Sequence, residues 1–498
     1  MTFSPTSSPS KKSQLPKQLR SLYEAGFSVP LIRKKSDSLP PWELYQRIYA
    51  KGPYSFFLDS QQGHPPVQCY SYLGWKPYLR VSLEDRKFCV EGEENHTKKD
   101  PNLLIELRKL FLPVRVPPRI PADFFLGGAV GYFGYELAQE FERVTFRSKK
   151  GTGLPELRLL FFRDLIVFDH EEEKYYLISW LIPQKGVSFP QALQKAEENL
   201  AQMEEAFSYS NGKQNGEHFQ FLDFHPEISK SVFERMVLKA KAYIEAGDIY
   251  QANLSQRFSF RFEGSPLQIY DRLRRTNPAP FSGIFRWEDQ VIASSSPELL
   301  IAKKARDCLT RPIAGTRPRG WRSEETRRLS RELLANEKER AEHLMLVDLE
   351  RNDLGRVSEW RSVRVKDFMR VEKYARVMHL VSDVVGRMCP EKDCWDLIRA
   401  MFPGGTITGC PKIRSMEIID ELEPVKRGVY TGSLGYVGFN GDLMLNIAIR
   451  TLVLLKNQGY LQVGAGIVAD SDPSREYEET LAKGEALLEA LIAAETLP

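Results

Sequence analysis

Cysteines are few in this sequence, and long apolar runs do not occur. The six cysteines are scattered among 498 residues without C-x-x-C pairs, which excludes the dense disulfide framework of a small secreted domain and the common zinc-binding spacings. No run of about eighteen apolar residues is found, and residues 1–20 lack the apolar centre of a signal peptide. We therefore expect reduced thiols, a cytoplasmic location and no membrane association.

Neither sign of charge dominates the chain. Its 70 basic and 66 acidic residues leave a formal net charge of +4, and both kinds are spread along the whole length. Because the basic residues are not clustered in the sequence, we expect no basic surface of the kind that binds nucleic acid, and no nucleic-acid partner. The hydrophobic content of 42% is enough for a sizeable core, and together these features favour a globular protein that handles small molecules.

Composition divides the chain into four segments. Residues 1–18 are rich in Ser, Pro and Lys and are expected to be disordered; residues 19–207 form an N-terminal region of short β-rich runs that ends in an amphipathic helix. The polar, Gly- and Asn-rich residues 208–222 are interpreted as a linker or loop before a C-terminal region, 223–498. Strands come in hairpin-like groups with long helices between them, which predicts an α+β fold with largely antiparallel sheets.

Two pairs of glutamates are candidates for a metal site. Glu339 and Glu342 lie at i and i+3 in "NEKERAEHLMLVDLERNDLGRV", and Glu476 and Glu479 repeat the spacing in "DSDPSREYEETLAKGEALLEAL". In a helix this spacing puts two carboxylates on one face. Carboxylates gathered in a cleft repel unless a cation intervenes, and oxygen-only ligands suit Mg²⁺. The alternative is that both pairs are ordinary charged surface.

A glycine-rich turn and an arginine are the other candidate binding elements. "FPGGTITGCPK" supplies flexible backbone before a helix whose free N–H groups, with Lys412 and Arg414, could face an anion; the alternative is a plain strand-to-helix turn. Arg450 falls in the apolar run "LNIAIRTLVL", which is interpreted as a strand. A buried guanidinium without a partner is costly, so Arg450 needs a carboxylate from the protein or from a ligand.

Taken in order, these segments resemble the chorismate-utilising enzymes, among them component I of anthranilate synthase and of aminodeoxychorismate synthase. The similarity is dense from about residue 233 to residue 494 and weaker before that. It implies a four-layer α+β sandwich, chorismate as substrate, Mg²⁺, and a separate glutamine amidotransferase subunit that supplies ammonia.

The resemblance also implies roles for individual residues. The magnesium ligands would be Glu342 and Glu479, with Glu339 and Glu476 acting through water. Glu298 of "SSSPELL" would be the acid/base carboxylate, and His379 of "VMHL" would lie near the departing C4 hydroxyl. Without the resemblance, a helix-cap carboxylate and a core histidine are the preferred interpretations of these two residues. The implied substrate contacts are Gly315, Thr316, Tyr436, Arg450, Gly464, Ala465, Gly466 and Lys483.

Motifs that distinguish the products point in two directions. Aminodeoxychorismate synthases often carry a lysine, which adds to C2 of chorismate, where "RPIAGT" has Ala314; this alanine and Met378 indicate anthranilate synthase. In contrast, "IYQANLSQRF", "NPAPFSGIF" and "FLDS" are more similar to aminodeoxychorismate synthases. We expect aminodeoxychorismate, the precursor of 4-aminobenzoate and folate, with anthranilate for tryptophan synthesis as the alternative and an inactive aromatic-amino-acid sensor as a distant one.

Two of these motifs also bear on regulation by tryptophan. "FLDS" and "NPAPFSGIF" occupy segments that bind the inhibitor in tryptophan-regulated anthranilate synthases, and both depart from the sequences expected there. The residues of this possible tryptophan site are Ser60, Pro280, Phe281 and Ser282. We therefore expect tryptophan inhibition to be weak or absent, although Ser60 is able to hydrogen-bond a tryptophan held structurally.

Overall fold

The computed structural model describes residues 9–60, 69–118, 120, 122–147, 149–208, 219–319, 322–373 and 377–492. Within these residues the strands form two twelve-stranded sheets, in which the strand pairings are antiparallel. The predicted α+β class is confirmed.

The first sheet combines strands from both halves of the chain. In spatial order it consists of β1 (Val29–Lys35), β10 (Lys174–Leu181), β9 (Asp164–Asp169), β3 (Tyr70–Trp75), β2 (Tyr54–Asp59), β13 (Phe281–Trp287), β14 (Gln290–Ser296), β23 (Thr451–Leu455), β24 (Gln458–Ile467), β12 (Gln251–Glu263) and β11 (Gln220–Pro226), with β20 (Gly409–Cys410) on β12. The two halves join where β2 pairs with β13, with Asp59 opposite Ser282.

The second sheet is built in the same way. Its order is β17 (Ile313–Pro318), β19 (Val377–Arg387), β16 (Asp307–Arg311), β15 (Leu299–Lys304), β22 (Leu443–Asn446), β21 (Ser433–Gly438), β7 (Gly128–Phe133), β8 (Leu157–Phe162), β4 (Leu79–Glu84), β5 (Lys87–Gly92) and β6 (His96–Lys99), with β18 (Arg364–Lys373) on β19. Here β7 and β21 join the halves. The N- and C-terminal regions are therefore parts of one pair of sheets.

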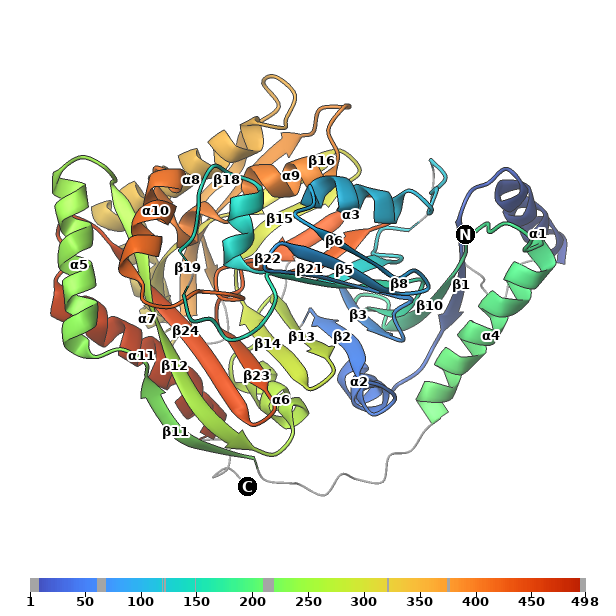
Figure 1. Ribbon diagram of the computed structural model, residues 1–498, viewed down its shortest axis with the longest axis horizontal. Helices are drawn as coiled ribbons and strands as arrows, with labels where there is room; N and C mark the ends of the chain where they lie inside the picture. The colour runs from blue at the N-terminus through green and yellow to red at the C-terminus, as the bar shows by residue number, and fades with distance from the viewer. Residues whose placement is uncertain are drawn as a thin grey trace.

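Helices cover the outer faces of the sheets. They are α1 (Pro9–Glu24), α2 (Pro41–Tyr49), α3 (Leu103–Phe111), α4 (Phe189–Ser208), α5 (Lys230–Glu245), α6 (Pro266–Thr276), α7 (Ser323–Ala335), α8 (Glu337–Gly355), α9 (Cys394–Met401), α10 (Lys412–Leu422) and α11 (Pro473–Ile492), with the short 3₁₀ helices η1 (Tyr135–Glu140) and η2 (Gly405–Ile407). Figure 1 shows α1 and α4 beside β1 and β10 at one end of the molecule, and α5, α10 and α11 at the other. No helix in the described part of the chain is long and apolar enough to cross a membrane.

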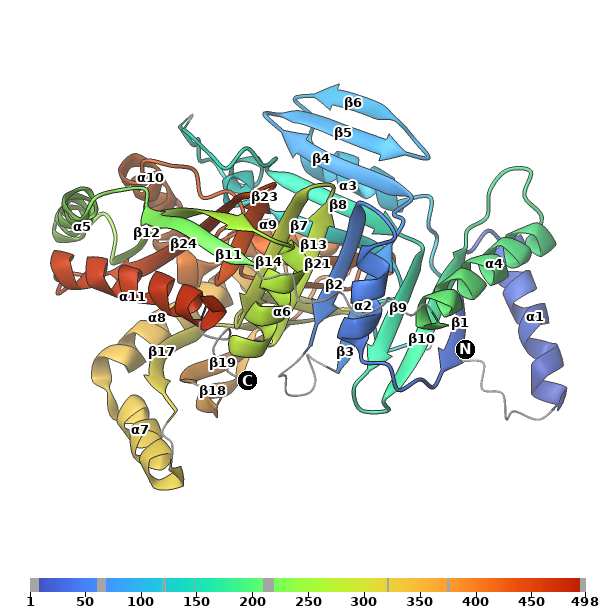
Figure 2. The ribbon, with the colours of Figure 1, turned by 90° about the horizontal axis from the view of Figure 1, so that it is seen from below.

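Neighbouring residues of β2 show why four layers form. Successive side chains of a strand point to opposite faces, so Phe56 and Phe57 enter different cores. The Phe56 ring meets Phe162 of the second sheet, with ring centroids 4.8 Å apart, whereas Phe57 stacks on Tyr45 of α2 at 5.4 Å. In Figure 2, α2 and α6 lie across the outer face of this sheet. The strand is apolar on both faces because one face meets a sheet and the other meets helices.

The segment boundaries differ from those expected at two places. Disorder was expected through residue 18, but α1 begins at Pro9, and its Leu19 and Tyr23 are buried in the outer core; residues 1–8 lie outside the described part. An amphipathic helix with apolar anchors is stabilised by this packing in spite of its polar start. The linker expected at 208–222 overlaps the last residue of α4 and the start of β11, and residues 209–218 lie outside the described part.

Candidate functional site

A cavity of about 480 Å³ lies where the C-terminal strands of the two sheets meet. Its walls come from β12 and β24 of the first sheet, β17 and β19 of the second, the loop of residues 276–280, η2 and α11. Five of the residues predicted as catalytic or substrate-binding line it: Glu298, His379, Arg450, Gly464 and Lys483. Residues almost 200 positions apart therefore share one site.

Two cations lie on the cavity wall. Arg450 immediately precedes β23 with φ +50°, and its Nη1 donates to Asn277 Oδ1 at 3.4 Å. The prediction that Arg450 lies within an apolar strand is wrong, because the chain bends there before the strand begins. Lys483 of α11 donates to the carbonyl of Gly464 at 3.0 Å and pairs with Glu479 at 2.7 Å. A guanidinium and an ammonium at one cavity suit a ligand that bears carboxylates.

Glu298 is a buried acid on the cavity wall. It lies between β14 and β15, so the helix-cap interpretation does not apply. Its backbone N–H donates to Ser296 Oγ at 3.2 Å, and its carbonyl accepts from the N–H of Ile447 at 3.0 Å, which fixes the backbone. Burial raises the pKa of Glu298 to about 8, and the nearby Glu350 carboxylate adds to the increase. The side chain is therefore mostly protonated at neutral pH and able to act as a general acid.

His379 faces the same cavity in its neutral form. Burial lowers the pKa of His379 to about 4, and the positive charge of Arg450 contributes to the decrease. Its Nδ1 lies 3.3 Å from the carbonyl oxygen of Gly315. Because a carbonyl only accepts hydrogen bonds, this contact assigns the proton to Nδ1 and the lone pair to Nε2. The histidine is buried, as a core histidine would be, but it lies at the cavity.

The strand β17 carries the segment "RPIAGT" past His379. Gly315 has φ +65°, and a Cβ built there would lie 2.6 Å from Glu339 Oε2, so this position requires glycine. Thr316 lies opposite His379 in the β17–β19 register. Ile313 of this strand lines the cavity, and Ala314 is buried opposite Leu380. Gly315 thus links the histidine to the first glutamate pair.

The two glutamate pairs influence each other electrostatically. Burial raises the pKa of Glu342, and the charges of Glu339 and Glu479 increase it further; burial and Glu479 likewise raise the pKa of Glu476. Glu339 nevertheless pairs with Arg317 at 3.0 Å. No three acidic, histidine or cysteine side chains of the described residues are gathered closely enough to hold a metal ion. The donors fit Mg²⁺ chemically, since all are carboxylate oxygens, and the magnesium assignment stays a prediction.

The glycine-rich turn before α10 is a strand-to-helix connection. Lys412 is buried in an ion pair with Asp353, and Arg414 pairs with Asp248 at 3.2 Å. Both cations are thus engaged by protein carboxylates, so the expectation that these two side chains face an anion is not supported. The turn instead brings Thr406 and Ile407 to the cavity wall.

Tyr436, Ala465 and Gly466 are predicted substrate contacts that are not among the residues lining the main cavity. Tyr436 lines a separate, smaller cavity; the tyrosine that lines the main cavity is Tyr430, six residues earlier in "RGVYTG". The side chain of Ala465 is buried in an apolar cluster under α5, so only its backbone lies in the glycine-rich strand segment. The cavity is lined by Gln462, Val463 and Gly464 of β24. Ala465 follows them but packs into the apolar cluster.

Sequence reasoning also missed other polar residues of the main cavity. These are Asn253, Thr276, Asn277, Thr406 and Gln462. Gln462 could have been predicted, because it lies two residues before Gly464 in β24 and residues two apart in a strand share one face. Asn253 could not have been predicted, because its position at the cavity depends on the pairing of β12 with β24.

The smaller cavity contains the possible tryptophan site. Ser60, Pro280, Phe281 and Ser282 all line it, as predicted from their motifs, together with Tyr436. Its volume is about 40 Å³. The Tyr436 ring stacks on Phe125 with centroids 4.4 Å apart and meets Tyr72 edge-on at 5.5 Å. The space is sufficient for one or two water molecules and too small for an indole ring.

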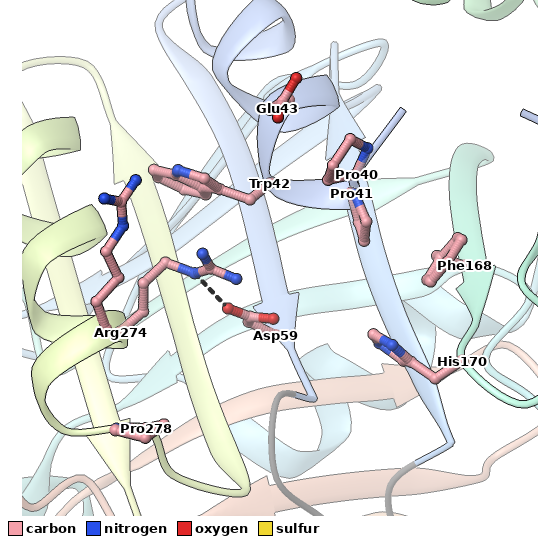
Figure 3. A pocket seen from close by; sticks show the side chains of 10 residues that line it. Pro40, Pro41, Trp42, Glu43, Asp59, Phe168, His170, Arg274 and Pro278 are labelled. Atoms are coloured by element: carbon pink, nitrogen blue, oxygen red, sulfur yellow. Dashed lines mark hydrogen bonds and ion pairs between the residues drawn. The ribbon is translucent and has the colours of Figure 1, made fainter. Parts of the chain in front are cut away.

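A third, open depression of about 490 Å³ adjoins both cavities (Figure 3). Asp59, which also lines the small cavity, accepts a hydrogen bond from Arg274 Nε at 2.8 Å. The Arg274 guanidinium lies 5.1 Å from the centre of the Trp42 ring, and His170 lies on the opposite side of the depression. This ion pair joins the end of β2 to the end of α6, and so anchors the following segment 276–282 that lines the two cavities.

Comparisons with known proteins agree with this arrangement. Residues 53–489 match the model of the chorismate binding enzyme family. The chain is 38% identical to anthranilate synthase component 1 of Aquifex aeolicus (strain VF5), over 96% of this chain and 97% of that one. It is 41% identical to aminodeoxychorismate synthase component 1 of Bacillus subtilis (strain 168), over 94% and 97%. The crystal structure of anthranilate synthase component I from Streptococcus pneumoniae TIGR4 superposes with a TM-score of 0.76 at 36% identity, covering 91% and 98%.

Proposed function

The chain belongs to the family of chorismate-binding enzymes, and from this we propose that it aminates chorismate to 4-amino-4-deoxychorismate in a Mg²⁺-dependent reaction. In this proposal a glutamine amidotransferase subunit supplies ammonia. The observation that carries it is one cavity in which the cations Arg450 and Lys483 accompany a protonated Glu298 and a neutral His379. That combination binds a dicarboxylate and offers a proton to a leaving group.

The proposed chemistry follows from these protonation states. Arg450 holds one carboxylate of chorismate bidentately, and so fixes the face that the ring presents. In the amination to 4-amino-4-deoxychorismate, a C–N bond to ammonia forms at C4 and the C4–O bond breaks. Glu298 gives its proton to the departing hydroxyl, which leaves as water, and the proton that the new amine loses restores the Glu298 carboxyl. The Glu339, Glu342, Glu476 and Glu479 carboxylates would hold Mg²⁺, which supplies Lewis-acid stabilisation of the second carboxylate.

Anthranilate is the second candidate product. It is favoured by Ala314, at the position where aminodeoxychorismate synthases often carry a lysine, and by the relatives named anthranilate synthase component 1. Aminodeoxychorismate is favoured by the small volume of the cavity at Ser60 and by the motifs around it. The two products share the cavity chemistry but differ in the ring carbon that receives the nitrogen. This carbon is C4 for 4-amino-4-deoxychorismate and C2 for anthranilate, whose formation also eliminates pyruvate.

One incubation tests the proposal. The protein is mixed with chorismate, Mg²⁺ and ammonium, and the products are separated by chromatography. We expect 4-amino-4-deoxychorismate. Anthranilate with equimolar pyruvate identifies the alternative activity, and unchanged chorismate with a folded protein contradicts both and identifies an inactive homologue.

Replacing Glu342 by glutamine is expected to raise the Mg²⁺ concentration needed for half-maximal chorismate consumption about tenfold or more, because one charged oxygen ligand is lost. Thermal stability should change little, since removing a charge from neighbouring carboxylates relieves repulsion. Glu478→Gln is the matched control, because Glu478 precedes Glu479 on α11 but is exposed and pairs with Lys230. Undiminished activity in excess chelator would refute the metal assignment.

Glutamine is expected to support the reaction only when an amidotransferase is added, whereas ammonium supports it alone. None of the six cysteines lies in a G-x-C-x-G turn that would expose a nucleophile, and burial raises the pKa of the Cys410 thiol. The measurement compares chorismate consumption by the purified chain with each nitrogen source. Glutamine-dependent turnover without a second protein contradicts the prediction.

Tryptophan is expected to inhibit weakly or not at all, because the cavity at Ser60 and Phe281 is filled by aromatic side chains. Inhibition is followed as chorismate consumption at increasing tryptophan, and binding is followed separately by calorimetry. Tyr436→Ala is the informative variant: it enlarges this cavity and should create measurable tryptophan binding. Inhibition of the unmodified protein at low micromolar tryptophan would favour anthranilate synthase.

A further inference from the structure

The short helix η2 forms one side of the main cavity next to Glu298. Its Thr406 and Ile407 side chains line the cavity, and the Thr406 hydroxyl lowers the pKa of Glu298, partly opposing the increase caused by burial. The position of η2 therefore decides what the Glu298 carboxyl touches.

A buried carboxylate outside the cavity fixes the start of this helix. Glu350 of α8 is 2% exposed, and its Oε1 accepts from the backbone N–H of Gly405 at 3.2 Å. Its Oε2 accepts from the hydroxyl of Thr310 on β16 at 3.1 Å. Each oxygen thus has one donor, one from the cavity turn and one from the second sheet. Removing this acceptor would leave a buried N–H unsatisfied.

Gly405 allows η2 to approach α8 closely. A Cβ built on Gly405 would lie 2.3 Å from Leu349 Cδ2 and 3.3 Å from Glu350 Oε1. A larger residue would fit only if the Leu349 side chain or the turn moved. The contact between Glu350 and η2 is therefore direct and short, and a change at residue 350 is transmitted to the neighbouring Thr406.

Few charges face Glu350. Lys412 of α10 and Asp353 of α8 lie nearby and form an ion pair with each other, while the Glu298 carboxyl lies on the cavity side. Burial raises the pKa of Glu350 to about 7. Glu298 in turn is faced by Glu350 and by Arg450. Two buried acids so placed titrate as a coupled pair, in which a charge on one favours the proton on the other.

We propose that Glu350 is a positioning residue for the reaction: it holds η2 against Glu298 and supplies the negative charge on the far side of that turn. The expected effect on chorismate consumption rests on the proposed function, whereas the expected effect on the pKa of Glu298 does not. Glu350 touches neither the cavity nor the expected substrate, and it acts through Gly405, Thr406 and Glu298.

Glu350→Gln tests the charge of the side chain while nearly preserving its shape. Glutamine keeps an oxygen for the Gly405 N–H and an amide for Thr310, but it carries no charge. In the full-length protein, the basic limb of the pH profile for chorismate consumption should move to lower pH by about one unit, with KM little changed. Asp348→Asn is the matched control, since it removes an exposed charge from the same helix and should leave the limb in place.

A second readout does not depend on turnover. Proteins labelled with ¹³C at the glutamate carboxyl carbon are titrated by NMR, and the Glu298 signal is assigned by its loss in Glu298→Gln. The Glu298 midpoint should fall in Glu350→Gln and stay unchanged in Asp348→Asn. An unmoved midpoint in Glu350→Gln, or an equal shift in both variants, overturns the inference. Failure of the wild-type protein to consume chorismate refutes the proposed function instead, and the NMR titration still decides the role of Glu350.

Discussion

Replacing Glu298 by glutamine is expected to slow chorismate consumption by about 10²- to 10⁴-fold, the usual contribution of a positioned general acid. The side chain has the right protonation state for this role, because burial raises its pKa to about 8. Glutamine preserves the shape of the side chain but has no proton to give to a departing hydroxyl.

The pH dependence of the wild-type protein is the matching measurement. Activity needs the protonated form of Glu298, so kcat/KM should fall as pH rises through about 8. It also needs a neutral His379, whose pKa is about 4, so the rate should stay level down to that pH. Glu298→Gln should lack the basic limb, whereas Glu298→Asp should keep a basic limb at reduced rate because it retains an ionisable carboxyl.

Stability provides the control for this variant. The pKa of Glu298 is raised in the folded state from its ordinary value of 4.5, so the folded protein binds more protons than the unfolded chain between pH 4.5 and about 8. Its contribution to stability therefore declines as pH rises through this window. Glu298→Gln, which does not ionise, should gain stability relative to the wild type over the same range. An inactive variant that also unfolds more readily at pH 8 would contradict the assignment.

Replacing Arg427 by methionine is expected to lower the free energy of unfolding by about 3–5 kcal/mol, because it leaves Glu423 charged and buried. Arg427 is 1% exposed and Glu423 is 2% exposed, and Nε and Nη2 of Arg427 donate to the two carboxylate oxygens at 2.9 and 2.7 Å. Glu423 also accepts from the backbone N–H and the hydroxyl of Ser255. Losing one partner thus disrupts a network that joins α10 to β12.

Denaturant titration measures this effect, with an exposed ion pair as control. Arg20 and Glu24 have the same i, i+4 spacing but are 61% and 55% exposed, so Arg20→Met should change the free energy of unfolding by about 0.5 kcal/mol or less. The double variant Arg427→Met with Glu423→Gln should lose less than the sum of the single variants, because no unpaired charge remains. A loss below about 1 kcal/mol for Arg427→Met would contradict the prediction.

The Arg427 network also reaches the cavity wall. Arg427 Nη1 donates to the carbonyl of Ile407 at 3.0 Å, and its guanidinium lies 5.7 Å from the centre of the Tyr430 ring. Both Ile407 and Tyr430 line the main cavity. Partial unfolding around Arg427 would therefore change the substrate site as well as the stability.

The sequence by itself determined the local features of this protein. Asp472 caps the start of α11 through the N–H of Arg475 at 2.9 Å, and the i, i+3 spacing places each glutamate pair on one helix. Caps, helical periodicity and turns depend on residues a few positions apart, so they can be read from a short stretch. The motifs identified the family and, through it, the charged residues and the histidine of the candidate cavity: Glu298, His379, Arg450 and Lys483.

Only the tertiary structure decided which residues share the site and how they titrate. Tyr430 lines the cavity and Tyr436 does not, although the two lie six residues apart in one segment. Glu298, Glu350 and Thr406 come from three distant segments. Burial and the nearby Glu350 carboxylate raise the pKa of Glu298, and Thr406 partly opposes this increase. Desolvation and contacts between charges depend on what surrounds a side chain in space, and that surrounding is created by the pairing of strands far apart in the chain.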